Sequence, residues 1–131
     1  MSSEKTIKII HWIPRVLCIF AILFVSMFAL DAFQPNLTIW QQIGDFTMHL
    51  IPSFILLSFL ILAWKRELIG GIIFTLIGIL LSPFIFKMNY NMNHSIPMSL
   101  GIIASITFPF ILVGVLFITS YYLKKKQKTT Q

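Results

Sequence analysis

Four long apolar runs separated by short polar stretches dominate the pattern of the chain. A bilayer hydrocarbon core about 30 Å thick needs roughly 20 apolar residues in helical form, since each residue rises about 1.5 Å. Backbone polar groups cannot be left open in lipid, so each run is expected to be a helix. The predicted spans cover residues 13–33, 46–64, 68–86 and 100–123.

These runs predict an all-α fold, an integral membrane four-helix bundle with antiparallel up-and-down spans, in one transmembrane domain over residues 1–131. They are too continuous for a membrane β-barrel, whose strands alternate. The start resembles a signal peptide, but no small-residue cleavage site follows Leu30, so the first run is expected to be retained. The Lys65-Arg66-Glu67 connection is so short that the second and third spans must form a tight hairpin. The two longer connections are expected to be more mobile.

Loop charges predict the side of the membrane on which each connection lies. Lys and Arg gather before the first span, in the second connection and in the basic tail 124–131, whereas the first connection has none and the third has only Lys87. The positive-inside rule therefore places both termini and the second connection in the cytosol. Trp and Tyr residues near the ends of the runs match interfacial belts. The formal net charge of +6 thus indicates contact with membrane lipids and not with nucleic acid.

Composition agrees with a membrane protein and restricts its chemistry. Hydrophobic residues make up 57% and charged residues 11% of the chain, whereas typical globular proteins have about 45–50% and about 25%. The single cysteine, Cys18, excludes an internal disulfide and any chemistry that needs a cysteine pair. We find no catalytic motif and no spacing typical of a metal or cofactor site, so we expect a protein that is not an enzyme and holds no cofactor.

Small residues predict how the spans pack. Lipid tails are as apolar as leucine, so helices in membranes associate through close packing of small residues and a few hydrogen bonds. The third span carries such residues at spacings of four, three and four, which places them on one helix face. This predicted packing face consists of Gly71, Thr75, Gly78 and Ser82.

Pro52, Pro83 and Pro109 fall inside the second, third and fourth spans. Each removes a backbone donor and frees the carbonyl four residues earlier. Two interpretations are open. The prolines could produce hinges or a broken-helix binding site, as in transporters, or static kinks of the kind that membrane helices tolerate.

Polar residues gather at the predicted outer end. Asp45, His49 and Ser53 are spaced by four on the second span, Asp31 ends the first span on the same side, and His94 lies in the nearby third connection. Ionisable groups near a membrane core are functional candidates. The candidate polar site is therefore Asp31, Asp45, His49 and His94. It could hold a metal ion, relay protons or bind an ion, or simply contain an interfacial histidine bonded to Asp45 or water.

At the predicted cytosolic end, Arg15 lies near the start of the first span and Glu67 opens the third. Both lie on the same side of the membrane, and a carboxylate is the strongest partner for a guanidinium group. We therefore expect an Arg15–Glu67 ion pair that ties the first span to the central hairpin.

Four sequence stretches together resemble a family of small, uncharacterised, four-span bacterial membrane proteins that carry only a domain-of-unknown-function label. They are residues 11–18 (HWIPRVLC), 28–33 (FALDAF), 49–54 (HLIPSF) and 63–71 (AWKRELIGG). The resemblance implies a bacterial inner-membrane location and supports four spans. It implies no activity, cofactor or catalytic residue.

The sequence leaves two classes of function open. It favours a non-enzymatic accessory or structural membrane protein, with lipids and a second copy or another membrane protein as partners. The alternative is a small transporter or channel subunit that uses the region of Asp45 and His49. The distinguishing feature is whether these two side chains face the interior of the bundle or the lipid headgroups.

Overall fold

The computed structural model describes residues 3–130, and all of its regular elements are helices. They are α1 (Ser3–Met27), the 3-10 helix η1 (Phe28–Ala32), α2 (Ile39–Lys65), α3 (Glu67–Asn93), α4 (Ile96–Ile106) and α5 (Phe108–Thr130). Four helical stretches are long and apolar enough to cross a membrane, namely Glu4–Ala32, Ile39–Lys65, Glu67–Asn93 and Ile96–Thr130. The expectation of an all-α chain with four such helices is confirmed. Residues 1, 2 and 131, which end the predicted domain and tail, lie outside the described part.

Several helices extend well beyond the predicted spans, since α2 begins at Ile39, α3 ends at Asn93 and α5 ends at Thr130. A capping box begins α2, because the Thr38 side chain accepts a hydrogen bond from the Gln41 backbone and the Gln41 side chain accepts one from the Thr38 backbone. The predicted long first connection is therefore wrong, since its second half is helical. The third connection shrinks to His94, which ends α3 with a φ of 50°, and Ser95, which caps α4. Hydropathy measures the apolar thickness of a span, whereas capping residues set the ends of its helix.

The fourth run is helical from Ile96 to Thr130, as the sequence predicts, with a one-residue irregularity at Thr107. The carbonyl of Thr107 accepts hydrogen bonds from the N–H groups of Phe110 (3.1 Å) and Ile111 (3.2 Å). Pro109 follows at once and has no N–H to continue the ladder. Pro52 and Pro83, in contrast, lie inside the uninterrupted helices α2 and α3. The backbone of Thr107 keeps helical dihedral angles (φ −94°, ψ −33°), so the irregularity beside Pro109 favours a static kink over a broken helix.

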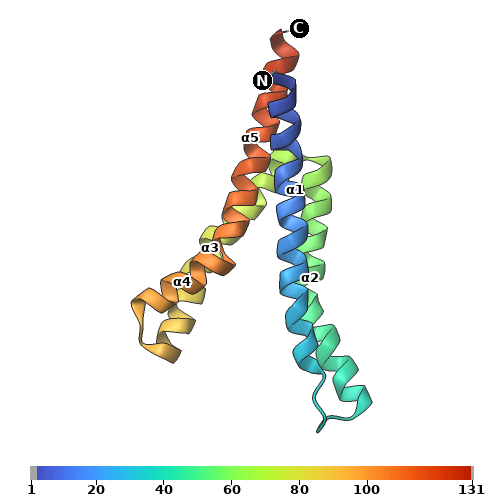
Figure 1. Cartoon of the computed structure of the whole chain (residues 1–131), viewed down its shortest axis with the longest axis vertical. Helices are drawn as coiled ribbons and strands as arrows, with labels where there is room; N and C mark the ends of the chain where they lie inside the picture. The colour runs from blue at the N-terminus through green and yellow to red at the C-terminus, as the bar shows by residue number, and fades with distance from the viewer. Residues whose placement is uncertain (1–2, 131) are drawn as a thin grey trace.

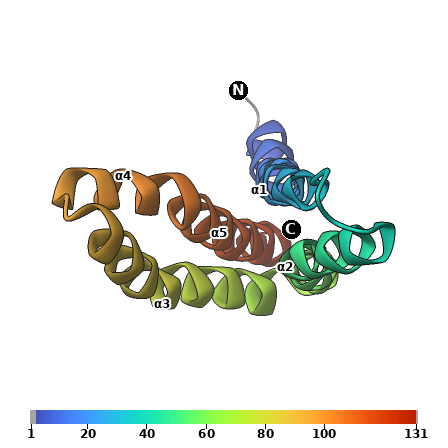
Figure 2. The same ribbon diagram turned by 90° about the horizontal axis from the view of Figure 1, so that it is seen from below.

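The helices form two arms that meet near the chain termini and separate at the other end (Figure 1). One arm consists of α1 and α2, and the other of α3 with α4 and α5. Both termini lie at the closed end, while the α1–α2 and α3–α4 connections form the tips of the two arms. The view from below shows the same separation (Figure 2). The two arms therefore come together in the half nearest the α2–α3 connection, where α1 packs against α5 and α2 against α3.

The apolar core fills this closed half. Phe74 of α3 is fully buried, and its ring stacks against Phe110 and Phe117 of α5 with both centroid distances at 6.3 Å. The other buried members of the core come from α1, α2 and α5, and are Cys18, Leu60, Ala63 and Val113. The aromatic column joins the two helices of one arm, and the smaller side chains allow the other arm to approach it.

The predicted small-residue face of α3 packs directly against α5. A Cβ atom on Gly71 would lie 2.7 Å from the Gly114 carbonyl oxygen, and one on Gly78 would lie 3.1 Å from the Thr107 carbonyl oxygen. Further along, the Ser82 and Thr107 hydroxyls are 2.8 Å apart and share a hydrogen bond. The close approach of two backbones leaves no room for a side chain at these glycines. All four predicted residues lie along this contact: Gly71, Thr75, Gly78 and Ser82.

Candidate functional site

The predicted outer polar residues lie on the surface and on different arms. Asp31 on η1, Asp45 and His49 on α2, and His94 between α3 and α4 are all exposed. The α1–α2 and α3–α4 tips are separated in both views (Figures 1 and 2). The four residues therefore do not form one pocket, because the arms that carry them diverge. Across residues 3–130, no group of three or more His, Cys, Asp or Glu side chains is arranged to hold a metal ion.

His49 has a local structural partner. Its Nδ1 atom lies 2.8 Å from the backbone carbonyl oxygen of Asp45, one turn earlier, and so donates a hydrogen bond to it. The partner is the backbone of Asp45 and not its carboxylate, and the interfacial position of His49 stays a prediction. Ser53, the third member of the stripe, is buried and accepts a hydrogen bond of 2.9 Å from the Ser26 hydroxyl of α1. Of the three residues spaced by four, Asp45 and His49 are therefore on the surface, whereas Ser53 lies in the contact between α1 and α2.

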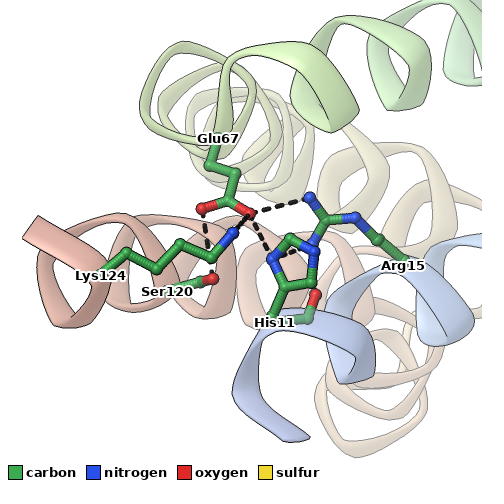
Figure 3. A network of polar contacts seen from close by, with 5 residues as sticks. All are labelled: His11, Arg15, Glu67, Ser120 and Lys124. Carbon is green, nitrogen blue, oxygen red and sulfur yellow. Dashed lines mark hydrogen bonds and ion pairs between the residues drawn. The ribbon is translucent and has the colours of Figure 1, made fainter. Parts of the chain in front are cut away.

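The densest polar arrangement lies at the opposite, closed end and centres on Glu67, the first residue of α3 (Figure 3). The expected ion pair is present, since Arg15 Nη2 lies 2.8 Å from Glu67 Oε1. The same oxygen lies 2.6 Å from His11 Nδ1 and 2.9 Å from Lys124 Nζ. The second oxygen, Oε2, accepts a hydrogen bond of 3.2 Å from the Ser120 hydroxyl. We call these five residues the Glu67 network.

Arg15 is the deepest charged group of this network, with 1% of its side chain exposed. Its guanidinium lies between the rings of Trp64 and Phe117, at 5.2 Å from each centroid, an arrangement that favours a cation over the ring faces. Nη1 donates to the backbone carbonyl of His11. A guanidinium remains charged at any physiological pH, so its burial requires a nearby negative charge. Glu67 supplies that charge, with 9% of its own side chain exposed.

Two helices, α1 and α5, supply the partners of Glu67. His11 and Arg15 are one turn apart on α1, and Ser120 and Lys124 are one turn apart on α5. The sequence had suggested Arg15 alone, with Lys124 as part of a tail that marks topology. The spacing of four between Ser120 and Lys124 was the signal that could have revealed the contribution of α5.

The geometry assigns the network a structural task. Both oxygens of the carboxylate have partners, namely a guanidinium, an ammonium group and an imidazole at Oε1 and a hydroxyl at Oε2. It joins α1, α3 and α5 at the point where the two arms meet. Breaking a buried pair by removing one partner is costly because the other charge is left uncompensated. The Glu67 network is therefore a polar cross-link between the arms.

The protein is all-helical, and four of its helical stretches are long and apolar enough to cross a membrane, which indicates a membrane protein. A buried carboxylate, Glu67, cross-links these helices at one end. The chain belongs to the family described as Domain of unknown function (DUF7670), whose model matches residues 3–130. The resemblance noted in the sequence is thus confirmed at the level of the family. Neither the curated proteins nor the solved structures compared with the chain gave a match.

Proposed function

We propose that the protein is a non-enzymatic, accessory or structural protein of the bacterial cytoplasmic membrane, with four antiparallel spans and both termini in the cytosol. Cations support this orientation, because they concentrate in the termini and at Lys65 and Arg66 of the α2–α3 connection. These segments lie toward the same end of the molecule (Figure 1). Lys87, within α3, is the only lysine or arginine between residues 67 and 123, and residues 16–64 contain none.

The observation that carries the proposal is that the buried charges are engaged with one another. Arg15 and Glu67 pair across α1 and α3, and the core beyond them consists of apolar side chains. Asp45 and His49, on which a transport function would depend, lie on the exposed surface instead. This arrangement suits a protein that acts through contacts in the membrane better than one that moves a solute through its interior.

The outer surfaces of the two arms are suited to such contacts. Large apolar side chains are widely exposed, for example Phe20 of α1 (65%), and Leu80 (70%) and Phe84 (61%) of α3. In a bilayer these side chains face lipid tails or another helix, and neither costs free energy. Membrane lipids and a second copy or another membrane protein are therefore the proposed partners.

Photo-crosslinking in cells tests this function. A photoreactive residue in place of Leu80, which is exposed, is expected to give a reproducible crosslink to one membrane protein or to a second copy. The same residue in place of Phe74, which is fully buried on the same helix, is the matched control and should crosslink only within the chain. Mass spectrometry of the products identifies the partner.

Two findings together would contradict the proposed accessory function. Leu80 would yield only lipid adducts, and reconstituted protein would conduct ions or protons at a rate lowered by Asp45→Asn or His49→Ala. Those findings together would replace the accessory function by transport, because they would show that the exposed polar residues of α2 carry the activity.

A further inference from the structure

A cavity of about 440 Å³ lies beside the Glu67 network, where the α2–α3 connection meets α5. Its volume falls within the range of roughly 300–1,000 Å³ that is typical of small-ligand sites. Lys65, Arg66 and Lys124 line it, together with Glu67 and the rings of Trp64 and Tyr121. The cavity thus combines cations with aromatic side chains.

The charges around the cavity do not balance. Among residues 3–130, Glu67 is the only carboxylate in its wall, and it is already held by Arg15 and Lys124. Lys65 and Arg66 are exposed and form no ion pair with a carboxylate of residues 3–130. With Arg15 behind the wall, four cations face one carboxylate. A concave surface with an excess of one charge sign concentrates ions of the opposite sign.

Backbone donors add to this attraction. The cavity borders the first turn of α3, whose leading N–H groups have no partner within the helix. Arg66, the N-cap residue, makes no side-chain capping bond. The carboxyl end of α2 meets the same connection and carries the opposite partial charge, so the two helix dipoles partly cancel. The side-chain cations therefore set the sign of the field, and the free N–H groups offer hydrogen bonds to an anion.

We propose that this cavity binds an anionic phosphate group, which in the membrane is the headgroup of an anionic phospholipid. Arg66 and Lys65 supply the charge, and Trp64 and Tyr121 are side chains typical of the headgroup level of a bilayer. The proposal rests on the membrane orientation given above, which puts this end at the cytosolic interface. It does not depend on whether a protein partner binds at Leu80.

A pair of double variants tests the site in the purified full-length protein in neutral detergent. Lys65→Gln/Arg66→Gln removes two cations from the cavity. Lys125→Gln/Lys128→Gln removes two exposed cations from nearby α5, outside the cavity wall. The thermal midpoint is followed during titration with short-chain phosphatidylglycerol, with phosphatidylcholine of the same chain length, and with inorganic phosphate.

Phosphatidylglycerol is expected to raise the midpoint of the wild-type protein, because a ligand that binds only the folded state stabilises it. The cavity variant should need on the order of tenfold more of this lipid for half the effect, whereas the α5 variant should match the wild type. A response to inorganic phosphate would identify free phosphate as a source, and a response to phosphatidylglycerol alone would identify the lipid. Equal weakening in both variants, an equal effect of phosphatidylcholine, or no shift with any anion would overturn the proposal.

Discussion

Replacing Glu67 with glutamine is expected to lower the free energy of unfolding by about 3 kcal/mol, the lower end of the range for breaking a buried ion pair. The amide retains the shape of the side chain but removes the negative charge beside Arg15, whose side chain is 1% exposed. The guanidinium would then remain buried between two aromatic rings without a counter-charge. The measurement is the unfolding of the purified protein in detergent, followed by helix content.

Glu4→Gln provides the matched control for this change. It makes the same chemical replacement on α1 at an exposed position, and no ion pair of Glu4 is present in the described part of the chain. Its stability should remain within about 0.5 kcal/mol of the wild type, as is usual for surface substitutions. If Glu67→Gln behaved like Glu4→Gln, the Glu67 network would contribute nothing to holding the arms together.

The second large effect concerns the contact between α3 and α5. Gly114→Ala is expected to destabilise the protein by about 1–3 kcal/mol, because the new methyl group has no space and the helices must separate. Its Cβ would lie 2.6 Å from both the Gly71 carbonyl oxygen and the Thr75 backbone nitrogen, and would also overlap the Thr75 hydroxyl. Backbone atoms on the facing helix cannot move aside as a flexible side chain can.

Gly101→Ala makes the identical change in a different environment. Gly101 lies in α4, and a Cβ there would meet no heavy atom within 4 Å. Alanine in an open helical position should leave stability unchanged or raise it by about 0.5–1 kcal/mol, through the lower entropy of the unfolded chain. Equal losses in both glycine variants would show that the loss does not come from the α3–α5 contact, because Gly101 lies outside it.

The all-helical fold and the packing face could be predicted because both follow from local patterns. Apolar runs of span length require helices in a bilayer, and the spacing of Gly71 and Gly78 puts them on one side of α3 whatever the tertiary structure. The helix ends could not be obtained from hydropathy. Thr38 and Gln41 carried the information for the start of α2 in their capping chemistry.

Of the Glu67 network, only the pair of Arg15 and Glu67 could be predicted from the sequence. Arg15 and Glu67 lie at the ends of apolar runs on the same side, so a pair was expected and is present. At the predicted outer end the same reasoning grouped His49 with His94, and the structure places them on α2 and between α3 and α4, in separate arms. A sequence indicates which residues share one end of a bundle, whereas the divergence of its arms depends on the packing of α3 on α5 and of α1 on α2.

A double-mutant cycle on Arg15 and Glu67 tests most directly whether the buried pair holds the two arms together. The cycle compares the unfolding free energies of the wild type, Arg15→Met, Glu67→Gln and the double variant in the same detergent. We predict that each single variant has a lower free energy of unfolding than the wild type, and that the double variant is at least as stable as the less stable of the two single variants. The coupling energy is expected to be about 2–3 kcal/mol. Single effects that simply add, with a coupling energy near zero, would contradict a direct interaction between Arg15 and Glu67 and with it the cross-link between the arms.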